Sequence, residues 1–95
     1  MALLDLLGRR WALRVLWELR EESATFRELR ERCGGVSPTV LNDRLQELRD
    51  AGILDAPAEG GYRTTPEGQE LIGLLLPLHP WAAAWGRRQR KSSRG

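Results

Sequence analysis

The chain has 95 residues, 41% of them hydrophobic, which is enough to bury one core but not two, since domains usually run to roughly 100 to 200 residues. The chain has a single cysteine, Cys33, and a single histidine, His79, which excludes an intramolecular disulfide and a structural zinc site. No segment resembles a membrane span or a signal peptide, so we expect a cytosolic protein. The net charge of +2 combines residues 1–86, which carry ten basic and thirteen acidic groups, with residues 87–95, which carry five basic groups and no acidic one, so composition alone does not indicate a nucleic-acid partner.

Two helices are predicted at the start of the chain. Residues 2–7 form a brief apolar segment that ends at Gly8, and we expect it to pack on another helix or on a second subunit. Residues 9–22 form the clearest helix, because apolar residues recur on one face at helical spacing: Ala12, Val15, Leu16 and Leu19. Leu13 and Trp17 add a second apolar strip, so this helix is either central or shared with a partner chain.

A break at residues 23–25 precedes a third helix, predicted over residues 26–33. The break is long enough for one strand pairing and a helix cap, and Thr25 resembles the first residue of a capping box whose acid comes one position late. The residues predicted to face the core are Phe26, Leu29 and Cys33. We interpret Cys33 as structural, because a reactive thiol needs exposure and a lowered pKa. Gly34 and Gly35 then end the helix.

The fourth helix has the best-specified start in the sequence. The Ser37 hydroxyl can accept a hydrogen bond from the first backbone amides, and Pro38 occupies the first helical position, where its missing N–H costs nothing. The helix should run to about Ala51 and stop at Gly52. Its predicted buried stripe consists of Leu41, Leu45 and Leu48.

A minimal β-hairpin is predicted directly after this helix. Residues 53–56 and 62–65 are strand-like, and residues 57–61 form the turn between them. The winged helix-turn-helix order consists of three helices and a two-stranded hairpin, with a tight turn before the last of the three helices. Here the three helices are residues 9–22, 26–33 and 37–51, and the hairpin follows directly. The predicted fold class is therefore mainly α with a small β-hairpin.

Two more helices are predicted in the last third of the chain. The first starts after the N-cap Thr65 and runs to Leu76, and prolines at positions 77 and 80 must bend or break it. The second covers residues 81–88 and presents Trp81 and Trp85 on one face. Aromatic residues at helical spacing near a chain end are more often core or subunit interface than a ligand cage.

The chain is predicted to be a single domain, residues 1–90, followed by a basic flexible tail, residues 91–95. The basic groups near this end could touch DNA phosphates or could simply be solvated. They are Arg87, Arg88, Arg90, Lys91 and Arg94.

The side of the fourth helix opposite its leucine stripe is predicted to enter the major groove of DNA. An Asn side chain such as Asn42 can pair bidentately with adenine, and the Thr39 methyl group can touch a thymine methyl group. Asp43 either accepts from the cytosine amino group or repels phosphate, and the helix start at Ser37 suits a phosphate. The candidate DNA-binding residues are Arg27, Ser37, Pro38, Thr39, Asn42, Asp43, Arg44, Gln46 and Arg63.

Two of these arginines have a second interpretation. Arg44 could bind phosphate, which we favour, or could pair with Glu47 or Asp43 on the helix surface. Arg27 could bind phosphate or pair with an acid three or four residues away. The hairpin tip carries no Lys or Arg, so a minor-groove contact by the tip is not expected, and Arg63 at its base is the remaining phosphate candidate.

Several blocks of the sequence, in the same order, resemble the HxlR-type family, a branch of winged-helix bacterial transcription regulators related to the MarR group. The blocks are LGRRWAL (7–13), FREL (26–29), VSPTVLNDRLQEL (36–48), AGIL (51–54), YRTTPEG (62–68) and the closing segment 81–86. The resemblance implies a homodimer joined through the N- and C-terminal helices, with the recognition helices, residues 37–51, in successive major grooves of a palindromic duplex. The predicted interface residues are Leu3, Leu4, Leu7, Trp17, Trp81 and Trp85.

The sequence departs from this family at three points. The position after Ser-Pro is often basic in the family and here is Thr39, the hairpin is short, and the cysteine that redox-sensing relatives carry near the N-terminus is missing. An oxidant-sensing role is therefore not carried over, and no small-molecule effector can be named.

Two functions fit the sequence. The first is a cytoplasmic, nucleoid-associated DNA-binding regulator, and the alternative is a winged-helix protein-interaction module without DNA binding, which the acidic body and Asp43 would suit. The sequence has no phosphate loop, nucleophile elbow or metal motif, so we expect neither an enzyme nor a cofactor.

Overall fold

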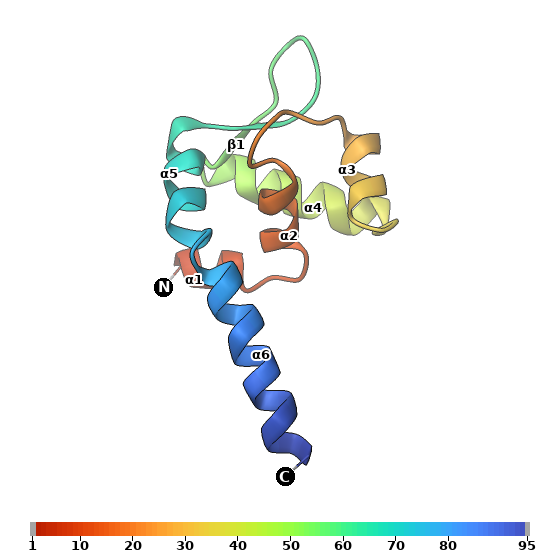
Figure 1. Ribbon diagram of the computed structural model, residues 1–95. Helices are drawn as coiled ribbons and strands as arrows, with labels where there is room; N and C mark the ends of the chain where they lie inside the picture. Colours follow the sequence, from red (N-terminus) through yellow and green to blue (C-terminus); the bar gives the residue numbers. More distant parts are fainter. Residues whose placement is uncertain (1, 95) are drawn as a thin grey trace.

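The computed structural model describes the backbone of residues 2–94 and the side chains of residues 5–78 and 80–90. Six helices and one two-stranded sheet make up this part of the chain (Figure 1). In order they are α1 (Ala2–Leu7), α2 (Ala12–Glu18), α3 (Phe26–Arg32), α4 (Pro38–Asp50), β1 (Leu54–Asp55), β2 (Arg63–Thr64), α5 (Pro66–Leu75) and α6 (Leu78–Arg94). The predicted winged helix-turn-helix order is confirmed. No helix among the described residues combines the length and the apolar composition needed to cross a membrane.

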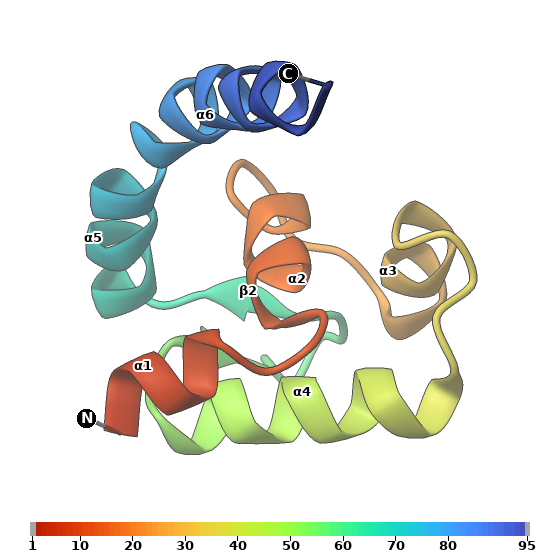
Figure 2. The same cartoon turned by 90° about the horizontal axis from the view of Figure 1, so that it is seen from below.

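The core forms where the leucine stripe of α4 meets α2 and α3. Leu41, Leu45 and Leu48 are buried, as predicted, and they belong to one apolar cluster with residues of α2 and with Leu29 of α3. Burying a leucine side chain fully contributes about 1.5–3 kcal/mol, so this stripe fixes α4 firmly on the body. Figure 2 shows α2 in the middle of the molecule with the other helices around it. Cys33 is also buried, as predicted, and this burial raises the pKa of its thiol.

Helix α2 is shorter than the predicted range of residues 9–22. Trp11 has a φ of 77°, in the left-handed region that residues other than glycine rarely adopt. The right-handed helix therefore cannot extend back through Trp11 into residues 9 and 10. At the other end, the chain leaves the helix after Glu18 and turns toward Ala24. The α2 boundaries are therefore set by these turns and not by the apolar period.

Helix α3 begins with a complete capping box. The Thr25 hydroxyl accepts a hydrogen bond from the Glu28 amide at 3.1 Å, and the Glu28 carboxylate accepts one from the Thr25 amide at 2.9 Å. The prediction that the acid comes one position late was wrong, because Glu28 stands at the third helical position, where the motif requires it. The hydrogen bond from the Thr25 amide lowers the pKa of Glu28.

The hairpin is tied to the loop between α2 and α3. Strands β1 and β2 are antiparallel, with Asp55 opposite Arg63, and each has two residues, so the strands are shorter than predicted. Ala24 pairs with Tyr62 in an isolated bridge, which is the strand pairing expected at residues 23–25. A Cβ atom at Gly68 would lie 2.2 Å from the Ile53 carbonyl oxygen, so α5 can approach the start of the hairpin closely because this residue is glycine.

Helix α6 extends beyond both predicted ends of the last helix, residues 81–88. It begins at Leu78 because Pro80 lies in the first turn, where backbone amides have no acceptor within the helix. It continues to Arg94, past residue 90, the predicted end of the domain. Figure 1 shows α6 projecting from the body, and the chain measures 54 × 27 × 25 Å along its principal axes.

Candidate nucleic-acid interface

The N-terminal end of α4 presents an exposed polar surface, which we call the recognition face. Its members are Ser37, Pro38, Thr39, Asn42 and Asp43, and all five are exposed. They lie on the side of α4 opposite the buried leucine stripe, so the core holds them on a fixed support. The structure therefore brings together the predicted groove-facing residues at this end of the helix.

The start of α4 leaves little of its backbone available to an anion. Pro38 has no N–H, and the Val40 amide donates to the Ser37 hydroxyl oxygen at 3.1 Å. Among the backbone amides of positions 38–41, the Thr39 amide alone has no protein acceptor. A phosphate at this helix start would meet the Thr39 amide and the Ser37 hydroxyl group.

Arg27 and Arg30, both on α3, have different surroundings. The Arg27 Nε atom lies 3.5 Å from Glu31 Oε1, and its side chain is 90% exposed, so this surface pair contributes little and leaves the guanidinium accessible. The Arg30 Nε atom donates to the Val36 carbonyl oxygen at 2.9 Å and so holds the turn between α3 and α4. Sequence periodicity gave no signal for this bond, because its acceptor is a backbone atom.

Arg44 faces the body of the protein. Its side chain is 15% exposed, its Nε atom donates to the Arg10 carbonyl oxygen at 3.0 Å, and its Nη1 atom lies 2.6 Å from Glu47 Oε1. The favoured interpretation, a phosphate contact, stays a prediction and is disfavoured by this geometry. The alternative, a pair with Glu47, describes it correctly.

Gln46 and Arg63 are exposed but have partners on the surface. The Gln46 amide donates to Asp50 Oδ1 at 2.8 Å. Arg63 pairs with Asp55 at 3.2 Å and with Glu59 at 3.9 Å. The single cation of the hairpin is thus balanced by two acids, which disfavours a close approach of this hairpin to phosphates.

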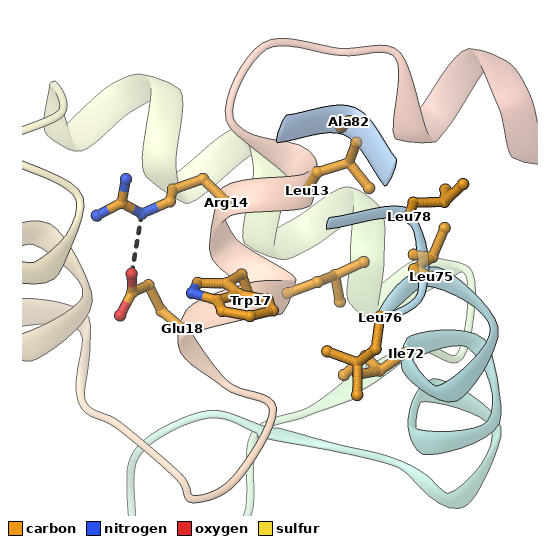
Figure 3. Close-up of a pocket in the computed structure, with 10 residues that line it drawn as sticks. Leu13, Arg14, Trp17, Glu18, Ile72, Leu75, Leu76, Leu78 and Ala82 are labelled. Atoms are coloured by element: carbon orange, nitrogen blue, oxygen red, sulfur yellow. Dashed lines mark hydrogen bonds and ion pairs between the residues drawn. The ribbon is translucent and has the colours of Figure 1, made fainter. Parts of the chain in front are cut away.

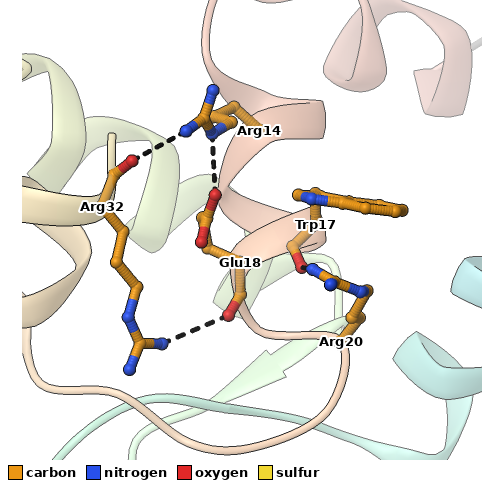
Figure 4. A network of polar contacts seen from close by, with 5 residues as sticks. All are labelled: Arg14, Trp17, Glu18, Arg20 and Arg32. Carbon is orange, nitrogen blue, oxygen red and sulfur yellow. Dashed lines mark hydrogen bonds and ion pairs between the residues drawn. The ribbon is translucent and has the colours of Figure 1, made fainter. Parts of the chain in front are cut away.

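A polar network that the sequence analysis missed joins α2 to α3 (Figure 4). Arg14 of α2 donates to the Arg32 carbonyl oxygen at 2.8 Å and pairs with Glu18 at 2.9 Å. The Arg20 guanidinium group lies 3.8 Å from the centre of the Trp17 ring and donates to the Trp17 carbonyl oxygen. The spacing of Arg14 and Glu18, four residues apart, was the available signal for part of this network.

A second surface, the apolar groove, lies between α2, α5 and α6 (Figure 3). Its cavity volume is about 460 Å³. Its lining residues are Leu13, Arg14, Leu16, Trp17, Glu18, Ile72, Leu75, Leu76, Leu78 and Ala82. Trp17, a predicted interface residue, is therefore part of this groove, and its ring is half-buried.

The other predicted interface residues lie in different environments. Trp81 and Trp85 stack with their ring centres 6.2 Å apart and are 58% and 47% exposed, so α6 presents both to solvent in the single chain. Leu7 is half-buried against the core of its own chain. Leu3 and Leu4 belong to α1, but their side chains lie outside the described residues.

Comparison with known proteins gives one family. The family model described as HxlR-like helix-turn-helix matches residues 6–90. YvaP of Bacillus subtilis (strain 168), an uncharacterized HTH-type transcriptional regulator, is 29% identical over 87 residues, which cover 85% of this chain and 81% of YvaP. YtfH of Escherichia coli (strain K12), another such regulator, is 33% identical over 78 residues, which cover 76% of this chain and 62% of YtfH.

Solved structures agree in the arrangement of the chain. Quinone-bound YodB of B. subtilis superposes with a TM-score of 0.80 at 26% identity, covering 87% of this chain and 93% of YodB. A protein of Thermoplasma volcanium described as a possible HxlR family transcriptional factor has a TM-score of 0.78 at 26% identity, with coverage of 90% and 82%. The likeness thus extends over most of both chains.

Proposed function

Since the chain belongs to the HxlR-like helix-turn-helix family and is a DNA-binding transcriptional regulator, we propose that it works as a homodimer whose two α4 helices enter successive major grooves of a palindromic site. The observation that carries the proposal is the recognition face. Thr39 and Asn42 are exposed at the N-terminal end of a helix whose opposite side is buried in the core. The N-terminal residues of a recognition helix are the ones that reach base edges.

Four of the five members of the recognition face have a chemical role in this proposal. The Asn42 amide pairs with an adenine edge, and the Asp43 carboxylate accepts from a cytosine amino group. The Thr39 methyl group contacts a thymine methyl group, while the Thr39 amide and the Ser37 hydroxyl anchor one phosphate. Asp43 then favours sites that place a cytosine amino group beside its carboxylate over sites with guanine or thymine, which present only acceptors or a methyl group there.

Arg27 is the cation best placed to add a phosphate contact. It is exposed on α3, the helix before the recognition helix, and its bond to Glu31 is weak enough to exchange. Arg44, Arg30 and Arg63 are engaged within the protein. We therefore expect few phosphate contacts in each protomer and a correspondingly shallow dependence of affinity on salt, about −0.9 in the logarithmic slope for each contact.

The apolar groove and the exposed face of α6 support the homodimer. The exposed large apolar side chains gather on α2, α5, α6 and the turn between the last two: Leu13, Leu74, Leu76, Leu78, Trp81 and Trp85. Soluble monomers rarely expose so many neighbouring apolar side chains, and such surfaces mark interaction sites. We propose that a second copy of the chain covers them.

The test of base recognition is a fluorescence-anisotropy titration with a labelled duplex from the protein's own promoter region and with a scrambled duplex. Asn42→Ala should lower affinity for the promoter duplex about tenfold or more and change affinity for the scrambled duplex little, because a bidentate base contact is worth about 1–3 kcal/mol. The control is Glu70→Ala, which removes an exposed side chain on α5 to which no base contact is assigned. Equal losses on the two duplexes would contradict the assignment of Asn42.

If the wild-type chain shows no salt-dependent binding to any duplex, the proposal of a DNA-bound homodimer is wrong. The winged-helix scaffold would then act as a protein-interaction module, which is the alternative that its acidic body suits.

A further inference from the structure

The turn between α1 and α2 is bonded to the middle of the recognition helix. The Arg44 Nε atom donates to the Arg10 carbonyl oxygen at 3.0 Å, and the Arg44 Nη1 atom lies 2.6 Å from Glu47 Oε1. The Arg9 Nε atom lies 3.3 Å from Glu47 Oε2. We call these groups, Arg9, the Arg10 carbonyl, Arg44 and Glu47, the Arg44 network. It joins segments 34 residues apart in the sequence.

The network is shielded from water at α4 and open at the turn. The side chains of Arg44 and Glu47 are 15% and 30% exposed, whereas that of Arg9 is 56% exposed. The Glu47 Oε2 atom is buried and accepts no hydrogen bond. Its interaction with Arg9 is therefore an ion pair in which no N–H points directly at the oxygen. Because this buried oxygen has an ion pair and no hydrogen bond, its energy changes when Arg9 moves even slightly.

The turn itself has a strained backbone. Trp11, the residue after Arg10, has a φ of 77°, and it is the one residue other than glycine with a positive φ among those described. Its ring packs against the core, and the Arg10 guanidinium lies 5.7 Å from the ring centre. Strained conformations persist where surrounding contacts hold them, and the bond from Arg44 to the Arg10 carbonyl is such a contact.

The leucine stripe and the Arg44 network hold α4 on two different sides. The stripe fixes the depth of α4 on the body, and the network adds a polar attachment on its flank. Together they define the rotation of α4 about its axis, which sets the direction of Asn42, two residues before Arg44. A base contact depends steeply on donor and acceptor geometry, so a small rotation is enough to weaken it.

We propose that Arg44 and Glu47 are positioning residues, which orient the recognition helix through the α1–α2 turn and touch no DNA themselves. This proposal rests on the proposed function. Because α1 ends at Leu7, directly before the turn, the network also links α4 to the N-terminal helix of the proposed homodimer. A movement of α1 in the dimer therefore changes the orientation of the recognition face.

The decisive variant is Arg44→Lys, which keeps the charge. The single ammonium group of lysine cannot occupy both guanidinium positions, so the bonds to the Arg10 carbonyl and to Glu47 cannot both persist. We expect affinity for the promoter duplex to fall about tenfold, with an unchanged slope of log Kd against log salt and with unchanged affinity for the scrambled duplex. A phosphate ligand at this position would tolerate lysine, so binding equal to wild type on the promoter duplex would overturn the proposal.

Arg44→Gln and Glu47→Gln also distinguish a positioning role of Arg44 from a phosphate contact, by the change in salt slope and by the direction of the change in affinity. If Arg44 held a phosphate, Arg44→Gln would reduce the salt slope by about 0.9 for each protomer, and Glu47→Gln would release the arginine and raise affinity. The proposal predicts an unchanged slope for both variants and lower affinity for the promoter duplex in both. Arg27→Gln, on the exposed α3 arginine, is the control that should reduce the slope.

Folding is monitored by circular dichroism and thermal unfolding of every variant. A role in stability alone would lower binding to the promoter and scrambled duplexes by the same factor, and this result would overturn the proposal. If Arg44→Lys does not fold, Glu47→Gln carries the test. Absence of duplex binding by the wild-type protein would instead refute the proposed function itself.

Discussion

Helices α4 and α6 both have an apolar face, but only one of them finds a partner for it within the chain. The α4 stripe of Leu41, Leu45 and Leu48 is buried, whereas Trp81 and Trp85 of α6 remain about half exposed. Helix α4 lies across the core, and α6 projects from the body (Figure 1). An apolar helix face therefore does not by itself mark the core of a chain, and the unpartnered one is the face proposed for a second copy.

The largest effect expected from this contrast is on α4. Leu45→Ala should lower the free energy of unfolding by about 2–5 kcal/mol, because it removes a fully buried side chain and leaves a cavity. Denaturation in urea at a fixed protein concentration measures the change. A loss below about 1 kcal/mol would mean that the site collapses around alanine and that α4 is less firmly held than its burial indicates.

The next effect is on α6 and should appear in association. Trp85→Ala should weaken the homodimer by about 2 kcal/mol or more, roughly thirtyfold in the dissociation constant, because large aromatic residues dominate interface energies. Sedimentation equilibrium measures this constant, and Arg88→Gln on the same helix is the matched control. If Trp85→Ala leaves association unchanged, the exposed α6 face is not the dimer surface.

The smallest effect concerns the caps that position the two helices of the helix-turn-helix. Thr25→Ala should cost about 0.5–2 kcal/mol at pH 7, because it removes the hydroxyl that caps α3. The pKa of Glu28 is lowered in the folded state, chiefly by the Thr25 amide, so the stability it contributes is present above its ordinary pKa and is lost as the pH falls through the lowered value.

The difference in unfolding free energy between Glu28→Gln and the wild-type chain should therefore shrink in acid, because protonation of Glu28 removes the charge that the variant already lacks. Thermal unfolding of both proteins at pH 7 and pH 3 measures it. A difference that stays constant with pH would show that the capping box does not depend on the charge of Glu28.

The helix starts that the sequence predicted correctly depend on local motifs. Ser37 and Pro38 start α4 as predicted, and Thr65 caps α5, because each motif depends on residues within one turn. The predicted start of α2 was wrong because Trp11 is left-handed and its ring packs against the core. The predicted start of α6 was wrong because a proline in the first turn does not break a helix.

The recognition face was predictable because its exposed residues alternate with the leucine stripe in one helical pattern. The environment of Arg44 was not, because its acceptor is the carbonyl oxygen of Arg10, 34 residues earlier. A backbone acceptor leaves no trace in residue type. Interactions between distant segments are thus the part of the site that sequence reasoning misses.

The most direct test of the proposed homodimer on DNA is a hydroxyl-radical footprint of the promoter duplex at moderate salt. Two α4 helices in successive major grooves should give two protected patches related by the symmetry of the site, with centres about 34–36 Å apart, one helical turn of DNA. Both patches should be lost in Asn42→Ala at the same protein concentration. A single patch, or protection that Asn42→Ala leaves intact, would contradict the placement of two α4 helices in successive major grooves.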